Sequence, residues 1–222
     1  MSYRTGPKIV TDGLVLCLDA ADRNSYPGSG STWYDLSGNG NNGTLTNGPT
    51  FSSANHGFFV FDGSNDYVNC GLILPSTSNF TISCWFSTEY AGDNIAVFGN
   101  SSANGTNSLI MYTSTNYGNA TNQLRIYGLG TEILVGSDIR NTGFRYLNLT
   151  RNSNTFSLYL DNSLDSSAYA TGSFYNQLIL GNAFADGRPF QGGIACSMLY
   201  NRALSANEVT QNFEATKGRF GL

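Results

Sequence analysis

Hydrophobic and polar residues alternate with a period of two along much of this chain. The clearest case is "FTISCWFS", in which Phe80, Ile82, Cys84 and Phe86 share one face and the intervening residues share the other. Successive side chains of a strand point to opposite faces, so this segment predicts a β-strand with one face in a core. Comparable segments recur about a dozen times between turns rich in Gly, Asn and Ser. They include "GLVLCLDA", "HGFFVFDG", "NIAVFGN", "SLIMYTS", "QLRIYGL", "FRYLNLTR", "QLILGNA" and "GGIACSMLYN".

A hairpin and a helix are predicted near the end of the chain. The segment "TFSLYLDNSLD" alternates in the same way and contains turn residues at Asp161-Asn162-Ser163, which predicts two strands joined by a tight turn. In "LSANEVTQNFEATKG", Ser205 precedes Glu208 with the spacing of a helix capping box. Gly218 predicts the end of this helix. The helix has few apolar residues, so we expect it to pack on the strands as a closing element.

Many strands with almost no helix predict an all-β fold, an antiparallel β-sandwich (jelly roll) with one short C-terminal helix. The chain has 222 residues, of which 12% are charged, and no stretch reads as a linker. We therefore expect an N-terminal arm over residues 1–12 and a single domain over residues 13–222.

The stretch "DLSGNGNNG" contains Gly38-x-Gly40-x-x-Gly43, the spacing of a dinucleotide-binding turn. That function requires a strand before the first glycine and a helix at the third. Neither flank has a suitable pattern, because Gly, Pro, Thr and Asn dominate both sides. Glycine and asparagine both tolerate positive φ, so the stretch is interpreted as a series of tight turns.

Charge and composition exclude several partners and cofactors. A net charge of −4 with a pI near 4.8 argues against nucleic acid, which needs clustered Lys and Arg. We find no export signal and no apolar run long enough to cross a membrane, so no membrane partner is expected. The four cysteines allow three disulfide pairings, but their strand-like contexts favour buried reduced thiols. A zinc site is not expected, because His56 is the single histidine.

An ordered set of segments resembles a known family. "FDGSNDYV", "FTISCW", "SLYLDN", "LILGN" and "FQGGIACSMLYNRALSANEV" occur in the order and spacing of the laminin-G-like branch of the concanavalin A-like lectin/glucanase superfamily. The resemblance extends from about Gly13 to Phe213. The opening "GLVLCLDAADRNSYPGSGSTWYDLSGNGNNGTLTNGPTF" and the closing "NFEATKGRFG" resemble stand-alone versions encoded by tailed bacteriophages, including cyanophages.

The resemblance implies two curved antiparallel sheets with ligand loops at one rim, and in some members a calcium ion. The family often has an acidic residue directly after the Ile of its G-x-I segment, where this chain has Ala195. Calcium needs several oxygen ligands, and Asp19, Asp35 and Asn41 remain the candidate donors. Apart from this calcium candidate, we expect no cofactor.

Catalysis and sugar binding are both considered, because the superfamily includes glucanases. A retaining glycosidase needs two nearby carboxyl groups, but no predicted strand carries acids at alternate positions, and the chain has no G-x-S-x-G. We therefore expect that the protein is not an enzyme. Sugar binding needs an aromatic face beside polar side chains, although such rings commonly pack on sheet faces instead. The candidates for ligand binding are Tyr26, Trp33, Tyr34, Tyr112 and Tyr117.

We expect a structural protein of a phage virion, such as a capsid decoration, fibre or tail appendage, that contacts host surface glycans. An independent carbohydrate-binding lectin module and a glycoside hydrolase are the alternatives. The expected location is the virion surface, after assembly in the host cytoplasm, with other virion proteins or further copies of the chain as partners. The basic residues near the two ends form a hypothetical attachment surface for an acidic partner: Arg4, Lys8, Lys217 and Arg219.

Overall fold

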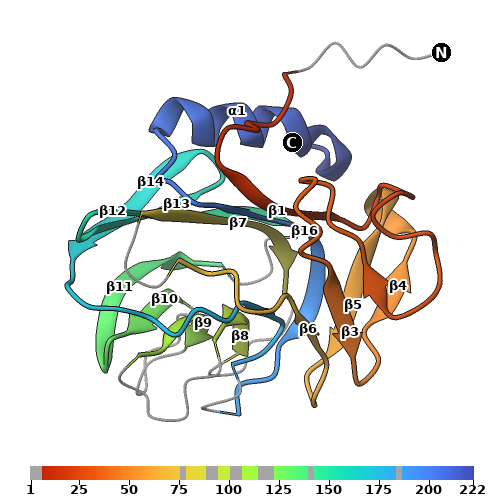
Figure 1. The fold of residues 1–222 in the computed structure, drawn as a ribbon, viewed down its shortest axis with the longest axis horizontal. Helices are drawn as coiled ribbons and strands as arrows, with labels where there is room; N and C mark the ends of the chain where they lie inside the picture. Colours follow the sequence, from red (N-terminus) through yellow and green to blue (C-terminus); the bar gives the residue numbers. More distant parts are fainter. Residues whose placement is uncertain are drawn as a thin grey trace.

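The computed structural model describes residues 7–75, 79–88, 95–100, 107–114, 123–139, 143–183 and 187–222. Two antiparallel sheets are stacked face to face, with one helix outside the first sheet (Figure 1). The predicted all-β sandwich with one short C-terminal helix is confirmed. Both the red start of the described chain and the C-terminus lie on the helix side (Figure 1).

The first sheet has the order β14 (Ser163–Tyr169), β13 (Thr155–Leu160), β12 (Arg145–Asn152), β7 (Phe80–Ser87), β16 (Gln191–Tyr200), β5 (Phe58–Asp62) and β4 (Thr50–Ser52), and β1 (Leu14–Asp19) also pairs with β16. The second sheet has the order β11 (Thr131–Asp138), β10 (Gln123–Gly128), β9 (Leu109–Ser114), β8 (Ile95–Gly99), β15 (Ile179–Leu180), β6 (Tyr67–Asn69), β3 (Gly43–Thr46) and β2 (Thr32–Trp33). In the second sheet, β15 pairs with β8 on one side and with β6 on the other, although both are far from it in sequence.

The main core lies between the two sheets. The predicted inner face of β7, formed by Phe80, Ile82, Cys84 and Phe86, is at most 1% exposed. Burying a large apolar side chain contributes roughly 1.5–3 kcal/mol, so this layer is the main stabilising element of the fold. The period-two pattern predicted this face correctly.

The outer face of β7 is buried as well, beneath α1 (Ala206–Thr216) and the 3₁₀ helix η2 (Lys217–Phe220). The Trp85 ring stacks on Tyr146, with centroids 4.9 Å apart, and on Phe220, at 4.3 Å. The indole Nε1 of Trp85 donates to Thr216 Oγ1 at 2.7 Å. The predicted packing of the helix on the sandwich is therefore confirmed, and it creates a second core.

The start of α1 is as predicted, but its end differs. The Ser205 side chain accepts a hydrogen bond from the backbone of Glu208, and the Glu208 side chain accepts one from the backbone of Ser205, so the capping box is confirmed. Gly218 does not end the helical segment, because residues 217–220 continue it as η2. The left-handed residue that ends the helical segment is Gly221, at φ 75°. The predicted hairpin turn between β13 and β14 is confirmed, with positive φ at Asp161 and Asn162.

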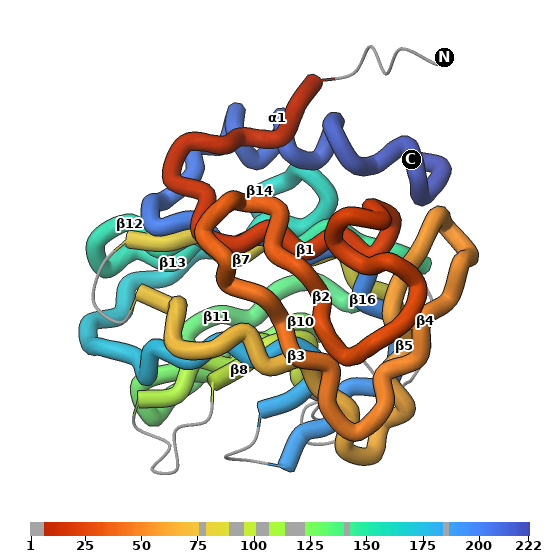
Figure 2. Tube along the Cα trace, turned by 45° about the vertical axis from the view of Figure 1, so that its right-hand side comes forward, coloured from red at the N-terminus to blue at the C-terminus, as the bar shows by residue number. Residues whose placement is uncertain are grey.

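The glycine-rich stretch covers the free edge of β1, which pairs with β16 on its other side. Leu36 N donates to Cys17 O at 2.8 Å, and Asn41 Nδ2 donates to Val15 O at 2.8 Å. Exposed edge strands offer unpaired backbone groups to other chains, so this loop protects β1 from such pairing. In Figure 2 the chain from β1 to β3, coloured red to orange, lies over this side of the sandwich.

The four cysteines, Cys17, Cys70, Cys84 and Cys196, are free and buried, which confirms the expected reduced thiols. In the described residues, no helix is both long and apolar enough to span a membrane.

Candidate functional site

The outer face of the second sheet carries an aromatic and charged cluster on the side away from α1 (Figure 1). We call it the second-sheet face and define it by Tyr112, Gln123, Arg125, Tyr127, Glu132 and Arg188. The alternation in β9 and β10 creates it. Leu124 and Ile126 point into the main core, so Gln123, Arg125 and Tyr127, which alternate with them, point outward.

Hydrogen bonds and ring contacts join these side chains. Arg125 lies directly opposite Tyr112 in the β9–β10 ladder. Its guanidinium forms an ion pair with Glu132 and donates from Nη2 to Gln123 Oε1 at 3.1 Å. The guanidinium carbon of Arg188 lies 4.5 Å from the centroid of the Tyr112 ring, within cation–π distance. The cluster is therefore organised in advance of any ligand.

Burial differs within the cluster and affects its chemistry. Arg125 is 5% exposed, whereas the Glu132 side chain is 37% exposed. Burial raises the pKa of Tyr112, and nearby Glu132 raises it further, while Arg188 and Arg125 partly oppose this shift. The phenol therefore stays protonated at neutral pH. Tyr112 is 8% exposed and its ring lies against Arg188, so Tyr127 is the ring of the cluster that can stack on a ligand. A carboxylate, an amide, guanidinium donors and one partly exposed tyrosine ring are groups that bind sugar hydroxyls and the apolar faces of sugar rings.

The predicted ligand-binding aromatics do not come together in one site. Tyr26 is 7% exposed and Trp33 is fully buried, and both pack edge-on against Phe59 in the main core. Neither ring is available to stack on a ligand from solvent. Tyr34 is 45% exposed beside the glycine-rich loop. Tyr112 belongs to the second-sheet face, and Tyr117 lies outside the described residues.

The three calcium candidates make hydrogen bonds within the fold, and both oxygens of Asp35 are engaged. Asp35 Oδ1 accepts from the backbone N of Cys17 at 2.8 Å, and Oδ2 accepts from Asn41 N at 3.0 Å. Asn41 Nδ2 donates to the β1 edge. Asp19 Oδ1 binds Arg219 Nη1 at 2.5 Å. Among the described residues, no group of three or more His, Cys, Asp or Glu side chains is placed to hold a metal ion.

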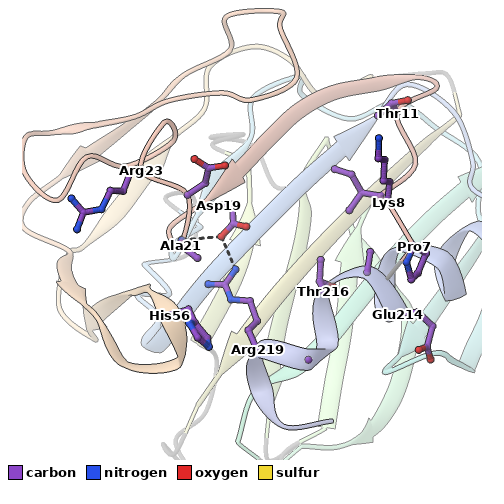
Figure 3. Close-up of a pocket in the computed structure, with 14 residues that line it drawn as sticks. Pro7, Lys8, Thr11, Asp19, Ala21, Arg23, His56, Glu214, Thr216 and Arg219 are labelled. Carbon is purple, nitrogen blue, oxygen red and sulfur yellow. Dashed lines mark hydrogen bonds and ion pairs between the residues drawn. The ribbon is translucent and has the colours of Figure 1, made fainter. Parts of the chain in front are cut away.

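A second feature is an open cleft of about 980 Å³ where the two ends of the chain meet (Figure 3). We call it the terminal cleft. Its walls come from the N-terminal segment with Lys8, the turn after β1 with Arg23, the 3₁₀ helix η1 (Ala54–His56), and the α1–η2 region. The Asp19–Arg219 ion pair lies in its middle (Figure 3).

The structure places two of the four predicted attachment residues in this cleft, namely Lys8 and Arg219. Arg219 is already paired with Asp19. Lys217 is not among the lining residues and pairs with Glu214 at 2.8 Å. Arg4 lies outside the described residues.

Comparison with protein families identifies the chain. A model of the laminin-G type in the concanavalin A-like lectin/glucanases superfamily matches residues 62–210. The chain belongs to this superfamily, as its sequence resemblance implied. No curated protein sequence matches it significantly.

Several solved structures share the fold. Domain 4 of AbnA, a GH43 extracellular arabinanase from Geobacillus stearothermophilus, in complex with arabinotriose, has a TM-score of 0.69 at 16% identity, and the match covers 90% of this chain and 98% of that one. Trypanosoma rangeli sialidase in complex with the inhibitor DANA has a TM-score of 0.67 at 16% identity, covering 93% of this chain and 33% of the sialidase. The binding domain of Paraclostridial Mosquitocidal Protein 1 has a TM-score of 0.64 at 17% identity, and the match covers 91% of this chain and 52% of that one.

These structures correct one prediction. The conclusion that the protein is not an enzyme is wrong as an exclusion, because the fold occurs in a domain of an arabinanase and in part of a sialidase. The chain spans about a third of the sialidase, with 33% coverage. At 16% identity the likeness shows the fold, and enzymatic status is not established. The lack of familiar catalytic patterns in the sequence was too weak a criterion.

Sequence reasoning identified Tyr112 but missed the rest of the second-sheet face. The signal was present in "QLRIYGL", where Gln123, Arg125 and Tyr127 alternate with apolar residues. Arg188, in contrast, reaches the face from a segment far away in sequence, and no local pattern marks it.

Proposed function

We propose that the protein is a carbohydrate-binding structural module carried on the outside of a bacteriophage virion, as a capsid decoration, fibre or tail appendage. The second-sheet face contacts glycans of the host surface. The opposite side, with α1 and the chain ends, is the side toward the particle. Partners are therefore other virion proteins on one side and sugars on the other.

The observation that carries the sugar-binding part is the organised cluster on the second-sheet face. Arg125 holds both the Glu132 carboxylate and the Gln123 amide, and it leaves Glu132 accessible at 37% exposure. Preorganised polar groups bind sugar hydroxyls without a further ordering penalty. The membership of the superfamily supports this part. A relative in fold, domain 4 of AbnA, is described in complex with arabinotriose.

The virion part rests on the resemblance of both chain ends to phage-encoded proteins and on the arrangement of the surfaces. Strands β9 and β10, which carry most of the cluster, lie on the side of the sandwich opposite α1 and the C-terminus (Figure 1). A module anchored near its ends therefore leaves the second-sheet face free to meet a host cell.

A glycan array tests the sugar-binding part. We expect saturable binding of the purified chain, reduced about tenfold or more by Tyr127→Ala and by Glu132→Gln, because each removes a contact group from the face. Tyr34→Ala is the matched control, since Tyr34 is also accessible, at 45%, but lies beside the glycine-rich loop. Loss of binding in Tyr34→Ala with retention in the other two variants overturns this assignment.

Mass spectrometry of purified particles from the phage source tests the virion part. We expect the chain in stoichiometric amounts in the particles. Its absence from particles, combined with intact glycan binding, favours an independent lectin module. A reducing-sugar assay on every glycan that binds separates binding from hydrolysis, and activity lost in Glu132→Gln assigns the chain to the glycoside hydrolases instead.

A further inference from the structure

The terminal cleft has an unusual charge arrangement. The carboxylates of Asp19 and Glu214 line it, but each is neutralised by a partner, Arg219 and Lys217 respectively. The Asp22 carboxylate caps its own turn, accepting from Asn24 N at 2.8 Å. With Lys217 counted as the partner of Glu214, two unpaired cations, Lys8 and Arg23, remain in the cleft against one carboxylate without a cationic partner, that of Asp22.

The remaining cations are Lys8 and Arg23, both exposed, and the exposed imidazole of His56 also lines the cleft. Within the described parts of the chain, none of these three side chains forms a hydrogen bond or an ion pair. Figure 3 shows Lys8 and Arg23 on opposite sides of the Asp19–Arg219 pair. A ligand that satisfies both must therefore reach across the cleft.

The backbone that carries these groups is fixed in place. The carbonyl of Lys8 accepts from Gln211 Nε2 of α1 at 2.8 Å, and Val10 N donates to Asn212 Oδ1 at 2.8 Å. Arg23 lies in a turn closed by Tyr26 N and Asp22 O at 2.8 Å. The cations thus project from an ordered frame rather than from free ends.

The η1 turn is held in an uncommon conformation. Asn55 and His56 both have positive φ, at 47° and 66°, which non-glycine residues seldom adopt. Arg219 Nη2 donates to Gly57 O at 2.6 Å and helps to hold this turn against the cleft. Backbone strain of this kind tends to occur at binding sites. Here it presents the single histidine to the cleft.

We propose that the terminal cleft binds an acidic, extended peptide segment of a partner protein. Spaced Asp or Glu carboxylates pair with Lys8 on one side and Arg23 on the other, and His56 adds a donor between the walls. None of the 14 described residues that line the cleft is Phe, Tyr or Trp, so it lacks the stacking surfaces that sugars and nucleobases use. The small apolar residues Ile9, Ala21 and Ala215 suit peptide side chains instead.

Fluorescence anisotropy with labelled hexaglutamate tests this proposal on the purified chain at low salt. We expect saturable binding that weakens about two- to fivefold in Lys8→Ala and in Arg23→Ala, the range for single exposed ion pairs, and further in the double variant. Raising the ionic strength weakens it too. Arg145→Ala is the control, because Arg145 and its ion-pair partner Asp161 both lie outside the lining, so the same charge is removed without changing the cleft and binding stays unchanged.

Circular dichroism and thermal melts of each variant show whether folding is retained. We expect it to be retained, because the side chains of Lys8 and Arg23 are exposed and neither packs in a core. Equal or tighter binding of a polyuronate or of single-stranded DNA, with the same dependence on Lys8 and Arg23, overturns the peptide assignment. Binding of hexaglutamate that is unaffected in the double variant overturns the site. Neither result bears on sugar binding at the second-sheet face, so the two proposals fail separately.

Discussion

Arg219 and Asp19, 200 positions apart in sequence, form an ion pair with Nη1 and Oδ1 2.5 Å apart. The same guanidinium donates to the carbonyl of Gly57, so one side chain joins η2, the end of β1 and the turn before β5. The Arg219 side chain is 10% exposed. Since its partners are largely shielded from water, this contact fixes the C-terminal segment on the sandwich more firmly than a surface ion pair would.

Arg219→Ala is expected to destabilise the protein by about 1–3 kcal/mol, because the Asp19 carboxylate loses its charged donor and keeps the backbone N of Ala21, and the Gly57 carbonyl loses the guanidinium as well. Urea denaturation followed by tryptophan fluorescence measures the loss. Lys217→Ala, which breaks a more exposed pair one turn away, is the control and should cost about 0–1 kcal/mol. Equal losses in the two variants would contradict the role assigned to Arg219.

Glu208 links the helix cap to Arg202, and the hydrogen bonds from Arg202 lower the pKa of the Glu208 carboxyl to about 2. A carboxyl whose pKa is lower in the folded state stabilises the fold above its unfolded pKa, here 4.5, and loses this contribution as pH falls toward about 2. Glu208→Gln should therefore be less stable than the parent at pH 7, by about 1 kcal/mol for a disrupted cap.

The difference between parent and Glu208→Gln should shrink as the pH falls through this window. Denaturation midpoints measured across the acid range check it. A constant difference down to the lowest pH would mean that the charge of Glu208 is not what stabilises the helix start. Asn207→Ala, a change at an exposed uncharged position of the same helix, serves as a control for helix stability alone.

The strands and the capping box could be predicted because their signals are local. In β7 the alternation of Phe80, Ile82, Cys84 and Phe86 gave the inner face directly. The burial of Trp85 on the other face depends on where α1 and η2 pack, and alternation alone does not encode that. The glycine at position 218 predicts a helix end, because glycine is a common stop, but η2 continues through it to Arg219 and its partners.

The candidate sites were harder to predict from the sequence than the strands, because their residues come from separate segments. The terminal cleft needs residues 8, 23, 56 and 219 to meet, and their meeting is determined by the tertiary arrangement of four separate segments. Trp33 was a ligand-binding candidate because it lies near Asp35 in the sequence. In the structure β2 turns its ring into the core against Phe59, which the local sequence does not encode.

Asp35 organises the glycine-rich loop at the edge of β1. Its two oxygens accept from three backbone amides, those of Cys17, Ser37 and Asn41. Asp35→Ala should therefore cost about 3 kcal/mol, since hydrogen bonds to a charged acceptor are lost and β1 is left exposed. Asp22→Ala, which removes a carboxylate from an exposed turn, is the control and should cost well under half as much. Chemical denaturation compares the two.

The same geometry predicts the response to calcium. Because both oxygens of Asp35 already hold backbone donors, and Asp19 Oδ1 already binds Arg219, a hard cation that needs several oxygen ligands would have to displace these partners. Thermal melts in millimolar calcium chloride and in excess chelator should give the same Tm. A clear rise in Tm with calcium, absent from Asp35→Ala, would restore the calcium site.

The cysteines provide a last test, on the packing of the cores themselves. Burial raises the pKa of both Cys17 and Cys70 from 9.0 to about 12, and it raises those of Cys84 and Cys196 in the same direction. The thiolate is the reactive form, so these groups should be inert to a thiol reagent at pH 8 in the folded protein. A thiol assay should count four reactive groups only after denaturation. The pKa values of these thiols are higher in the folded than in the unfolded state. The stability that comes from keeping the thiols protonated in the core is therefore complete below pH 9 and declines as the pH rises toward 12. In the thiol assay, rapid labelling of the native protein at pH 8 would show that the cores do not enclose the cysteine side chains.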